Sequence, residues 1–550
     1  MTKDFDVIVV GAGAAGSVIA ATAAETGKRV LILEAGPARG LSDLVSSQIH
    51  ARRLKWSGAP VIEEGSLPVG HGFNAGWGTG GGAAHHYAVW PRLHENDFTV
   101  RTDHGLGLDW PIDYDDLRPY YDRVQASVGI SGDAAQERWR PPGEPYPLDP
   151  LPVFAQGATI RRGFDAMNMH VAPIPVAINS RRVGPRAACL YDGWCDAGCP
   201  IGALANPLVT YLPRAVAAGT AIRHDAEVER VLQNDRGERA TGVVYRDAAG
   251  QRHRVTARQV VLAAFSVQNA RLLLNSYSER HPQGLGNNRD QVGRYVMTHP
   301  ATSTYGLFPG DTQPTLGVTG GQLMCHDRYA DKRPSDDRYG SYQWLIANAV
   351  KPNDLLGIAN SRPDVYGEAL EPFMQRAARH FGTMVAVVED IAQADNRITL
   401  SERKDAAGLP LAHCRHDIHP LTLKTSEAAE AEGLAIFRAA GAEEVWTGPR
   451  AGMHIMGGTV MGSDRDHSVT DSFGRCHDVD NLFIAGPGVF PSSGAVNPTY
   501  TLHALALREP DFAYEGEMHT DSALDPELRQ RIFPDSRLEG PANVLVFANT

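Results

Sequence analysis

The chain has 550 residues, of which 43% are hydrophobic and 21% charged, and its formal net charge is −12 at pH 7. This length predicts two domains rather than one simple core, and the composition is that of a globular protein. The negative charge argues against a nucleic-acid partner, because phosphate contacts require a basic face, and no apolar run approaches the roughly 20 residues of a membrane span.

Residues 5–36 follow the order of a dinucleotide-binding unit. Val7–Val10 is apolar and β-branched, as in a buried parallel strand, and Gly11, Gly13 and Gly16 follow at the G-x-G-x-x-G spacing. The first glycine permits a tight turn, the second lets the backbone approach a pyrophosphate, and the third lets the next helix pack on the strand. That helix is predicted over Ser17–Thr26, and its N-terminus offers free N–H groups to phosphate.

A second strand is predicted over Val30–Leu33, and it places Glu34 where an acid takes a ribose hydroxyl. Strand, glycines, helix, strand and acid occur in order, which predicts a dinucleotide site rather than a mere glycine-rich turn. The N-terminal position of the unit and its Glu-Ala-Gly-Pro context resemble FAD sites more than nicotinamide sites. We therefore include Ala14, Ala15 and Ala35 among the predicted cofactor contacts.

Three of the six cysteines, Cys189, Cys195 and Cys199, fall within eleven residues. Three thiolates in a short irregular loop suit a metal or iron–sulfur centre. Three other interpretations stay open. One is a zinc site that takes His170 as its fourth ligand. Another is disulfide pairing, which the odd count and a cytoplasmic setting disfavour. The last is a loop that serves only as scaffold.

Apolar strand and helix patterns recur far along the chain. We predict a hairpin over Val228–Val231 and Ala240–Tyr245, a strand over Gln259–Ala264, a helix over Val267–Leu274, strands of a second sheet over Arg397–Leu400 and Ala412–Arg415, and a strand over Asn481–Gly486. The dinucleotide-binding domain is therefore predicted to consist of separated pieces, with the second domain inserted between them.

The most specific motifs lie in residues 453–508. They read Met-His-Ile-Met-Gly-Gly-Thr-Val-Met-Gly, Asn-Leu-Phe-Ile-Ala-Gly-Pro-Gly-Val-Phe-Pro and Asn-Pro-Thr-Tyr-Thr-Leu-His. Together with blocks at 78–98 and 109–124, they resemble the glucose–methanol–choline (GMC) flavoprotein oxidoreductases, from residue 5 to about 508. The resemblance implies an α/β fold with a doubly wound, Rossmann-like FAD-binding domain. It also implies an inserted α+β substrate domain on a mainly antiparallel sheet.

The expected domain boundaries follow from this resemblance. The FAD-binding domain is assigned to residues 1–100, 205–300 and 445–508. The substrate domain is assigned to residues 101–204 and 301–444, and includes the Cys-rich loop 189–199. The segment after Arg508 departs from the family, and Glu509-Pro510 is expected to end the last helix early. For residues 509–550 we expect either a flexible tail or a partner-docking arm.

The active-site pair of the family is His with His or His with Asn, and the matching positions here are His454 and Asn497. A histidine with a pKa near neutrality suits removal of an alcohol proton, and a neutral amide can donate to the forming alkoxide. The alternatives are that His454 is a structural histidine and that Asn497 only caps the helix after Pro498. His503, one turn later, is expected to pack rather than react.

The resemblance also assigns further cofactor contacts: Gly81, Gly82, His86, Val228, Ala264, Gly486, Pro498 and Thr499. The helix that begins after Pro498 can stabilise negative charge on the reduced flavin. In sugar oxidases of the His/Asn branch, a histidine at the place of His86 can bond covalently to the flavin. This chain has His85-His86-Tyr87 where the family usually has Thr-His-Trp, so hydrogen bonding or packing is the other interpretation of His86.

The His/Asn pair resembles the branch with sugar oxidases and the flavin subunits of bacterial sugar dehydrogenases. It implies oxidation of a hydroxyl group of a sugar, glycoside or polyol by hydride transfer to flavin N5. The cysteine spacing resembles that of subunits holding a 3Fe-4S cluster, which would pass electrons to a cytochrome-bearing partner. The alternatives are an oxidase that uses dioxygen and a flavin-binding electron-transfer subunit that oxidises no alcohol.

The N-terminus shows no charged and apolar export signal. By its own sequence the chain is therefore expected in the cytoplasm. A small chaperone-like subunit could carry an export signal for it, which would place the protein in the periplasm or at a membrane.

Overall fold

The computed structural model describes residues 3–329, 332, 338–508, 525, 527 and 530. The chain divides into two units, Met1–Leu507 and Arg508–Thr550. The predicted tail, residues 509–550, lies outside the described residues except at those three positions. Within the described parts of the chain, no helix combines the length and the apolar character that crossing a membrane would require.

The first sheet is built around the predicted dinucleotide-binding strands. Its order is β5-β2-β1-β8-β7-β6, and β17 also pairs with β8. The strands are β1 (Phe5–Val10), β2 (Val30–Leu33), β5 (Ala221–Arg223), β6 (Glu227–Gln233), β7 (Ala240–Arg246), β8 (Arg252–Leu262) and β17 (Leu482–Ile484). The pairs among β1, β2, β5, β8 and β17 are parallel, whereas β6, β7 and β8 pair antiparallel.

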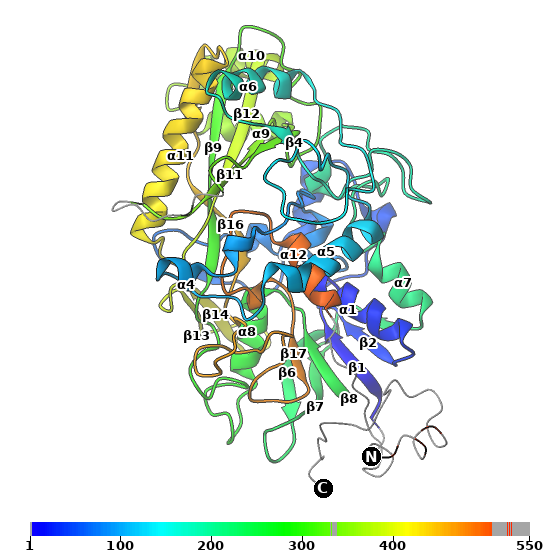
Figure 1. The fold of residues 1–550 in the computed structure, drawn as a ribbon. Helices are drawn as coiled ribbons and strands as arrows, with labels where there is room; N and C mark the ends of the chain where they lie inside the picture. The colour runs from blue at the N-terminus through cyan, green and yellow to red at the C-terminus, as the bar shows by residue number, and fades with distance from the viewer. Residues whose placement is uncertain are drawn as a thin grey trace. The chain divides into compact units, whose positions relative to one another are not determined.

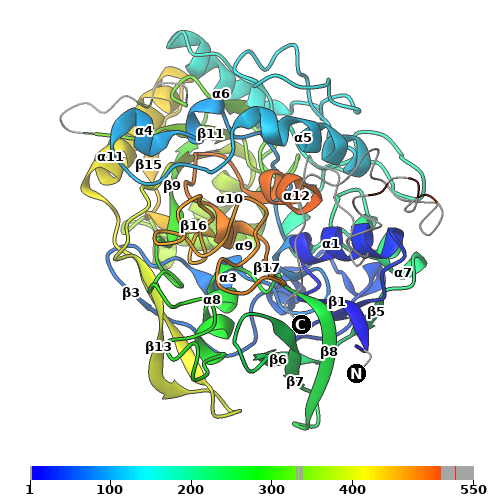
Figure 2. The same ribbon diagram turned by 60° about the horizontal axis from the view of Figure 1, so that its bottom comes forward.

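Helices pack beside this parallel core. Helix α1 (Ala14–Glu25) follows β1 and contacts α7 (Tyr211–Ala217) and α12 (Thr499–Leu507), as Figure 2 shows. Helix α8 (Ser266–Asn275) follows β8, and α5 (Tyr114–Val128) packs on α12. Residues Val7–Val10 of β1 and all of β2 are apolar and buried, because both faces of the sheet are covered.

The second sheet is antiparallel throughout, in the order β15-β9-β12-β11-β10-β4, with β16 also paired to β9. Its strands are β4 (Ala172–Pro173), β9 (Met297–Leu307), β10 (Leu323–Cys325), β11 (Tyr342–Ile346), β12 (Phe381–Val388), β15 (Glu444–Thr447) and β16 (Ala451–Met456). The long helix α11 (Pro420–Ala439) lies along β9 and β12 and contacts α6 (Ala155–Ala166), as seen in Figure 1. The remaining helices are α2 (Gln48–Ala51), α3 (His71–Asn74), α4 (Val100–His104), α9 (Pro352–Ala359) and α10 (Leu370–His380).

The fold class predicted from the sequence is confirmed, and so are the early strands and helix. The strands of a second sheet predicted at 397–400 and 412–415 correspond to β13 (Arg397–Lys404) and β14 (Pro410–Arg415), which pair with each other. They belong to a separate three-stranded sheet with β3 (Ile62–Glu64), not to the large antiparallel sheet. The sequence pattern predicted the two strands, but a local pattern carries no information on which distant strand pairs with them.

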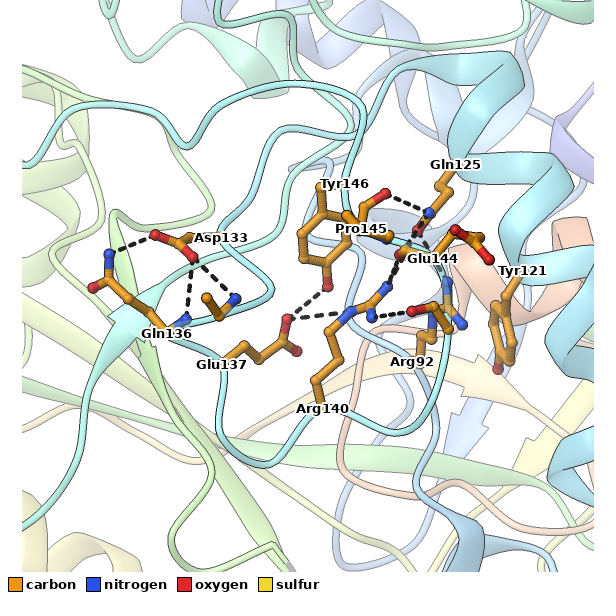
Figure 3. Close-up of polar contacts among 12 residues, drawn as sticks. Arg92, Tyr121, Gln125, Asp133, Gln136, Glu137, Arg140, Glu144, Pro145 and Tyr146 are labelled. Carbon is orange, nitrogen blue, oxygen red and sulfur yellow. Dashed lines mark hydrogen bonds and ion pairs between the residues drawn. The ribbon is translucent and has the colours of Figure 1, made fainter.

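A buried cluster around Arg92 ties α5 to the loop that follows it (Figure 3) and, through Tyr500, to α12. The Arg92 guanidinium, wholly buried, donates to Asp122 Oδ1 at 2.5 Å and to Gln125 Oε1 at 3.0 Å. The Gln125 amide donates to the carbonyls of Glu144 and Pro145, both at 2.9 Å. On the other side, the hydroxyl of Tyr500 in α12 donates to the carbonyl of Tyr121 in α5 at 2.7 Å. The cluster therefore holds α12 in place from outside the dinucleotide-binding core.

One carboxyl of the loop is buried with this cluster. Glu137 accepts a hydrogen bond from the Tyr146 hydroxyl at 2.7 Å and lies 3.8 Å from the Arg140 guanidinium. Burial raises the pKa of Glu137 to about 7, while the Tyr146 hydroxyl and Arg140 oppose that rise. The hydroxyl therefore stabilises the ionised carboxylate more than the neutral acid.

We predict that Tyr146→Phe lowers the free energy of unfolding by about 1–2 kcal/mol, because a buried carboxyl loses its hydrogen-bond donor. Without the hydroxyl the folded-state pKa of Glu137 rises further, so the loss should be small at pH 5 and grow as pH rises through about 7. Thermal unfolding at several pH values measures this. The control is Tyr366→Phe at a site that is 77% exposed, and equal effects of the two changes at pH 8 would contradict the prediction.

Candidate active site

The glycine loop after β1 is closely packed on two sides. A Cβ atom on Gly11, whose φ is +106°, would lie 2.6 Å from the carbonyl oxygen of Ala263. A Cβ on Gly16 would lie 2.1 Å from the Gly11 carbonyl oxygen, so this third glycine lets α1 pack on its strand. Gly13 is the N-cap of α1, and because glycine has no side chain it caps none of the helix N–H groups. The first turn of α1 therefore keeps N–H groups for an anion.

The acid at the end of β2 joins this loop. Glu34 is buried, and its two carboxylate oxygens accept hydrogen bonds from the backbone N–H groups of Ala12 and Gly36, both at 2.9 Å. These bonds fix the carboxylate beside the glycine loop. Carboxylate oxygens have further lone pairs, so the side chain can still accept from a ribose hydroxyl.

A single cavity collects nearly all the side chains that were predicted to bind the cofactor or to react. All the predicted FAD contacts except Gly16 line it, together with His454 and Asn497: Gly11, Gly13, Ala14, Ala15, Glu34, Ala35, Gly81, Gly82, His86, Val228, Ala264, Gly486, Pro498 and Thr499. These residues come from the N-terminal, middle and C-terminal parts of the chain and line the same cavity. The cavity is therefore fitted to a long dinucleotide such as FAD.

The strand that carries His454 is bulged at that residue. The register between β16 and β9 shifts between Met453 and Met456, and His454 has a left-handed backbone with φ +58°. A bulge re-aims a side chain that regular pleating would point elsewhere, and here it sends the imidazole into the cavity. Few non-glycine residues adopt this conformation, and strain of this kind gathers at functional sites.

The imidazole of His454 has a partner at each nitrogen. Its Nε2 lies 3.0 Å from Nδ2 of Asn497, and its Nδ1 lies 2.9 Å from Nδ1 of His299. Burial, and secondly the electrostatic effect of the adjacent His299, lower the pKa of His454 well below the ordinary histidine value. The ring is therefore neutral at neutral pH, which is the state of a proton acceptor.

The amide of Asn497 contacts side chains. Its Nδ2 faces His454, and its Oδ1 accepts a hydrogen bond from Nε2 of Gln343 at 3.2 Å. Both ends of the amide thus have partners other than the helix α12 that follows. This arrangement favours the substrate role over the capping role for Asn497.

The other histidines differ in their surroundings. His86 lines the cavity, and its Nε2 lies 2.9 Å from the carbonyl oxygen of Ala205. His503 packs its ring 4.7 Å from the Trp90 ring and directs Nδ1 at the Thr499 carbonyl at 2.7 Å, which fits the packing role expected for it. His503 is buried and His86 is half-buried, and desolvation lowers the pKa of each to about 4.

Some cavity residues had no signal in the sequence. Leu345 and Val385 come from β11 and β12 of the antiparallel sheet, and Asn348 follows β11. His299 and Gln343 were also missed, although they bond the proposed catalytic pair. A histidine beside Pro300 on a strand carries no pattern that separates it from other buried histidines.

The described residues give no support to the metal centre predicted at the cysteines. Among the residues that the structure describes, no group of three or more His, Cys, Asp or Glu side chains could hold a metal ion. Burial raises the pKa of Cys189 and Cys195 to about 12 and about 11, and a neighbouring cysteine adds to the rise in each case. All six cysteines are free, so the disulfide interpretation is wrong. His170 is not a fourth ligand, because its Nε2 lies 2.8 Å from the Gln136 carbonyl oxygen.

Comparison with known families gives two long matches. The family models described as GMC oxidoreductase match residues 5–301 and 392–506. A third model, described as phosphate acetyl/butaryl transferase, matches residues 496–550. This last match begins inside the C-terminal motif and covers the segment in which the sequence departs from the GMC pattern.

Curated relatives match along nearly the whole chain. The fructose dehydrogenase large subunit of Gluconobacter japonicus is 30% identical over 541 residues, covering 93% of this chain and 98% of the relative. The 2-methyl-1,2-propanediol dehydrogenase of Mycolicibacterium austroafricanum is 30% identical, covering 92% and 94%. Among solved structures, pyridoxine 4-oxidase from Mesorbium loti has a similar fold, with a TM-score of 0.60 at 17% identity, covering 91% of this chain and 97% of that one.

We predict that Gly13→Val abolishes FAD binding, because the methyl groups would fill the space through which the backbone approaches the pyrophosphate. The visible absorbance per mole of purified protein measures bound FAD. The control is Gly357→Ala in α9, where an added Cβ meets nothing within 4 Å. A Gly13→Val protein that retains one FAD per chain would contradict the assignment of this loop.

Proposed function

Since the chain belongs to the GMC oxidoreductase family, we propose that it oxidises a hydroxyl group of a sugar, glycoside or polyol with FAD held in the cavity. The observation that carries this proposal is the contact between His454 and Asn497 within the lining of the predicted cofactor site. When bound, FAD supplies a two-electron acceptor whose N5 atom takes a hydride. The chain must then supply a proton acceptor and a group that orients the alcohol.

His454 fits the proton acceptor. Its ring is neutral because burial lowers its pKa, and its Nε2 faces Asn497, which lines the same cavity. In the proposed reaction Nε2 removes the O–H proton of the substrate as the hydride leaves the adjacent carbon. The Asn497 N–H groups then donate to the oxygen on which negative charge develops.

The substrate class is supported by the relatives and by the cavity. The two relatives named above are called a fructose dehydrogenase subunit and a propanediol dehydrogenase. The antiparallel sheet adds apolar Leu345 and Val385 to the lining, and the amide of Asn348 adds a hydrogen-bonding group. A mixed lining of this kind suits a small molecule with both C–H faces and hydroxyl groups.

We also propose that the electrons pass to an acceptor other than dioxygen, since both relatives are named dehydrogenases. One of them is called a large subunit, which supports a partner polypeptide, such as a cytochrome, as the acceptor for this chain. The predicted iron–sulfur relay has no support among the described residues, and the iron content of the purified protein tests it. The second candidate function is an oxidase that uses dioxygen.

We predict that His454→Ala retains FAD and lowers the rate of flavin reduction by substrate about a hundredfold or more, the usual cost of a lost base. Anaerobic stopped-flow absorbance measures this rate. The control is His467→Ala, whose side chain is 69% exposed and pairs with Asp464. A near-normal rate in His454→Ala would mean that another group accepts the proton.

The pH dependence of the same rate follows from the lowered pKa of His454. The base works when neutral, so the rate should be constant from alkaline pH down through 6.5 and fall only at distinctly more acidic pH. An inflection near 6.5 that disappears in His454→Ala would contradict a desolvated base.

The substrate and acceptor are tested on the wild-type protein. We expect flavin absorbance to bleach when a sugar or polyol from a panel is added without oxygen, and to recover faster with ferricyanide or a quinone than with air. We also expect less than one iron per chain. Absence of bleaching with every alcohol would leave a flavin-binding subunit without alcohol oxidation. Fast recovery in air would favour the oxidase, and about three irons per chain would restore the cluster.

A further inference from the structure

A continuous line of hydrogen bonds runs through the catalytic pair and beyond it on both sides. On one side, Nδ1 of His454 meets Nδ1 of His299 at 2.9 Å, and Nε2 of His299 lies 2.9 Å from the carbonyl oxygen of Gly494. On the other side, Asn497 Oδ1 accepts from Gln343 at 3.2 Å. His299 and Gln343 are both wholly buried, so water cannot replace either partner.

The direction of each bond on the His299 side follows from the last acceptor. A backbone carbonyl only accepts, so Nε2 of His299 must carry the proton. In a neutral imidazole the other nitrogen is then a lone pair, and Nδ1 of His299 accepts. Nδ1 of His454 therefore donates, and its proton cannot reside on Nε2. The line thus leaves Nε2 of His454 as a lone pair, which is the form that a general base requires.

His299 remains neutral in its surroundings. Burial lowers its pKa, although Asp390 and Glu389 act in the opposite direction. The carboxylate of Asp390 is engaged by Nε2 of His416 at 2.8 Å, and that of Glu389 by Lys332 at 3.0 Å. Both charges are thus compensated by other partners, so they do not draw a second proton onto His299.

The directions on the Gln343 side agree with this assignment. Asn497 must donate to the lone pair of His454, so its oxygen faces Gln343 and accepts from the Gln343 amide. The Gln343 oxygen then accepts from Nε2 of His326 at 3.1 Å. Nδ1 of His326 is left to accept from Nε2 of His94 at 3.3 Å. Every bond in the line can point the same way, with no donor facing a donor.

We propose that His299 and Gln343 are positioning residues that fix the protonation site of His454 and the amide orientation of Asn497. Without His299, the proton of His454 is free to move to Nε2, where it blocks the base. Without Gln343, the Asn497 amide is free to turn its oxygen toward His454, which favours that same wrong form. The inference rests on the proposed function only in making Nε2 of His454 the base.

The first test compares two changes at each position in the FAD-loaded enzyme. His299→Leu removes the acceptor, whereas His299→Asn keeps an acceptor near the place of Nδ1. Gln343→Met removes the donor, and Gln343→Glu places a second acceptor against the Asn497 oxygen. We expect His299→Leu and Gln343→Glu to lower the rate of flavin reduction about a hundredfold and His299→Asn to restore most of it. The matched control is His281→Leu, another buried histidine that faces a backbone carbonyl.

A merely structural role would leave the pH profile of the reduction rate unmoved. We expect His299→Leu to shift the acidic limb of that profile, because the imidazolium of His454 loses its Nδ1 acceptor, and we expect His281→Leu to leave it in place. FAD content and melting temperature identify any variant that fails to fold. Rates and profiles of His299→Leu and Gln343→Glu that match the wild type would overturn the proposal.

A second readout does not depend on turnover. In wild-type protein labelled with ¹⁵N-histidine, the signals that vanish in His454→Gln identify His454, and their chemical shifts distinguish an N–H nitrogen from a lone-pair nitrogen. We expect Nε2 as the lone pair in the wild type and a loss of that state in His299→Leu. A protonated Nε2 in the wild type would overturn the inference. Failure of every alcohol to bleach the flavin would instead overturn the proposed function and leave this result intact.

Discussion

The 3.0 Å contact between Asn497 and His454 joins two separately built parts of the fold. His454 belongs to β16, which is paired to β9 in the antiparallel sheet. Asn497 leads into α12, which packs on α1 beside the parallel sheet. The proposed catalytic pair therefore exists only when both sheets are correctly placed. The Arg92 cluster serves the same end from outside, because it holds α12 against α5 through Tyr500.

Desolvation strengthens the hydrogen bonds of this site and at the same time requires that every polar group in it has a partner. Hydrogen bonds are stronger when buried than in water, but a buried polar group without a partner lowers stability by its full desolvation penalty. His299, Gln343 and His326 are buried and each has a partner at both ends of its side chain. The same burial that keeps His454 neutral thus requires that its neighbours be correctly protonated. The hydrogen bonds that satisfy the buried neighbours of His454 are therefore the same ones that hold His454 ready to act as a base.

Local patterns with a fixed spacing predicted the parts of the site that act through the backbone. The glycines of the first loop could be predicted from their spacing, because Gly11 and Gly16 lie too close to other backbone atoms for any side chain. The individual strands of the antiparallel sheet could not be predicted from the sequence, because β9, β11 and β12 pair over long sequence distances and such pairing leaves no local pattern. His299 and Gln343 were missed for that reason. The cysteine spacing predicts a metal centre that the described residues do not support, because closeness in sequence does not by itself fix where three side chains point.

The backbone around His454 shows how the motif that reads His-Ile-Met-Gly-Gly serves geometry as well as chemistry. A left-handed histidine costs about 1–3 kcal/mol, and the chain must still turn away from the cavity directly afterwards. Gly457 and Gly458 both have positive φ, and a Cβ on Gly457 would lie 1.9 Å from the carbonyl oxygen of Tyr295. The two glycines let the strand leave the bulge against the neighbouring backbone. The imidazole is therefore held by its own strained residue and the glycines that follow, while the bonds to His299 and Asn497 set only its protonation and its final orientation.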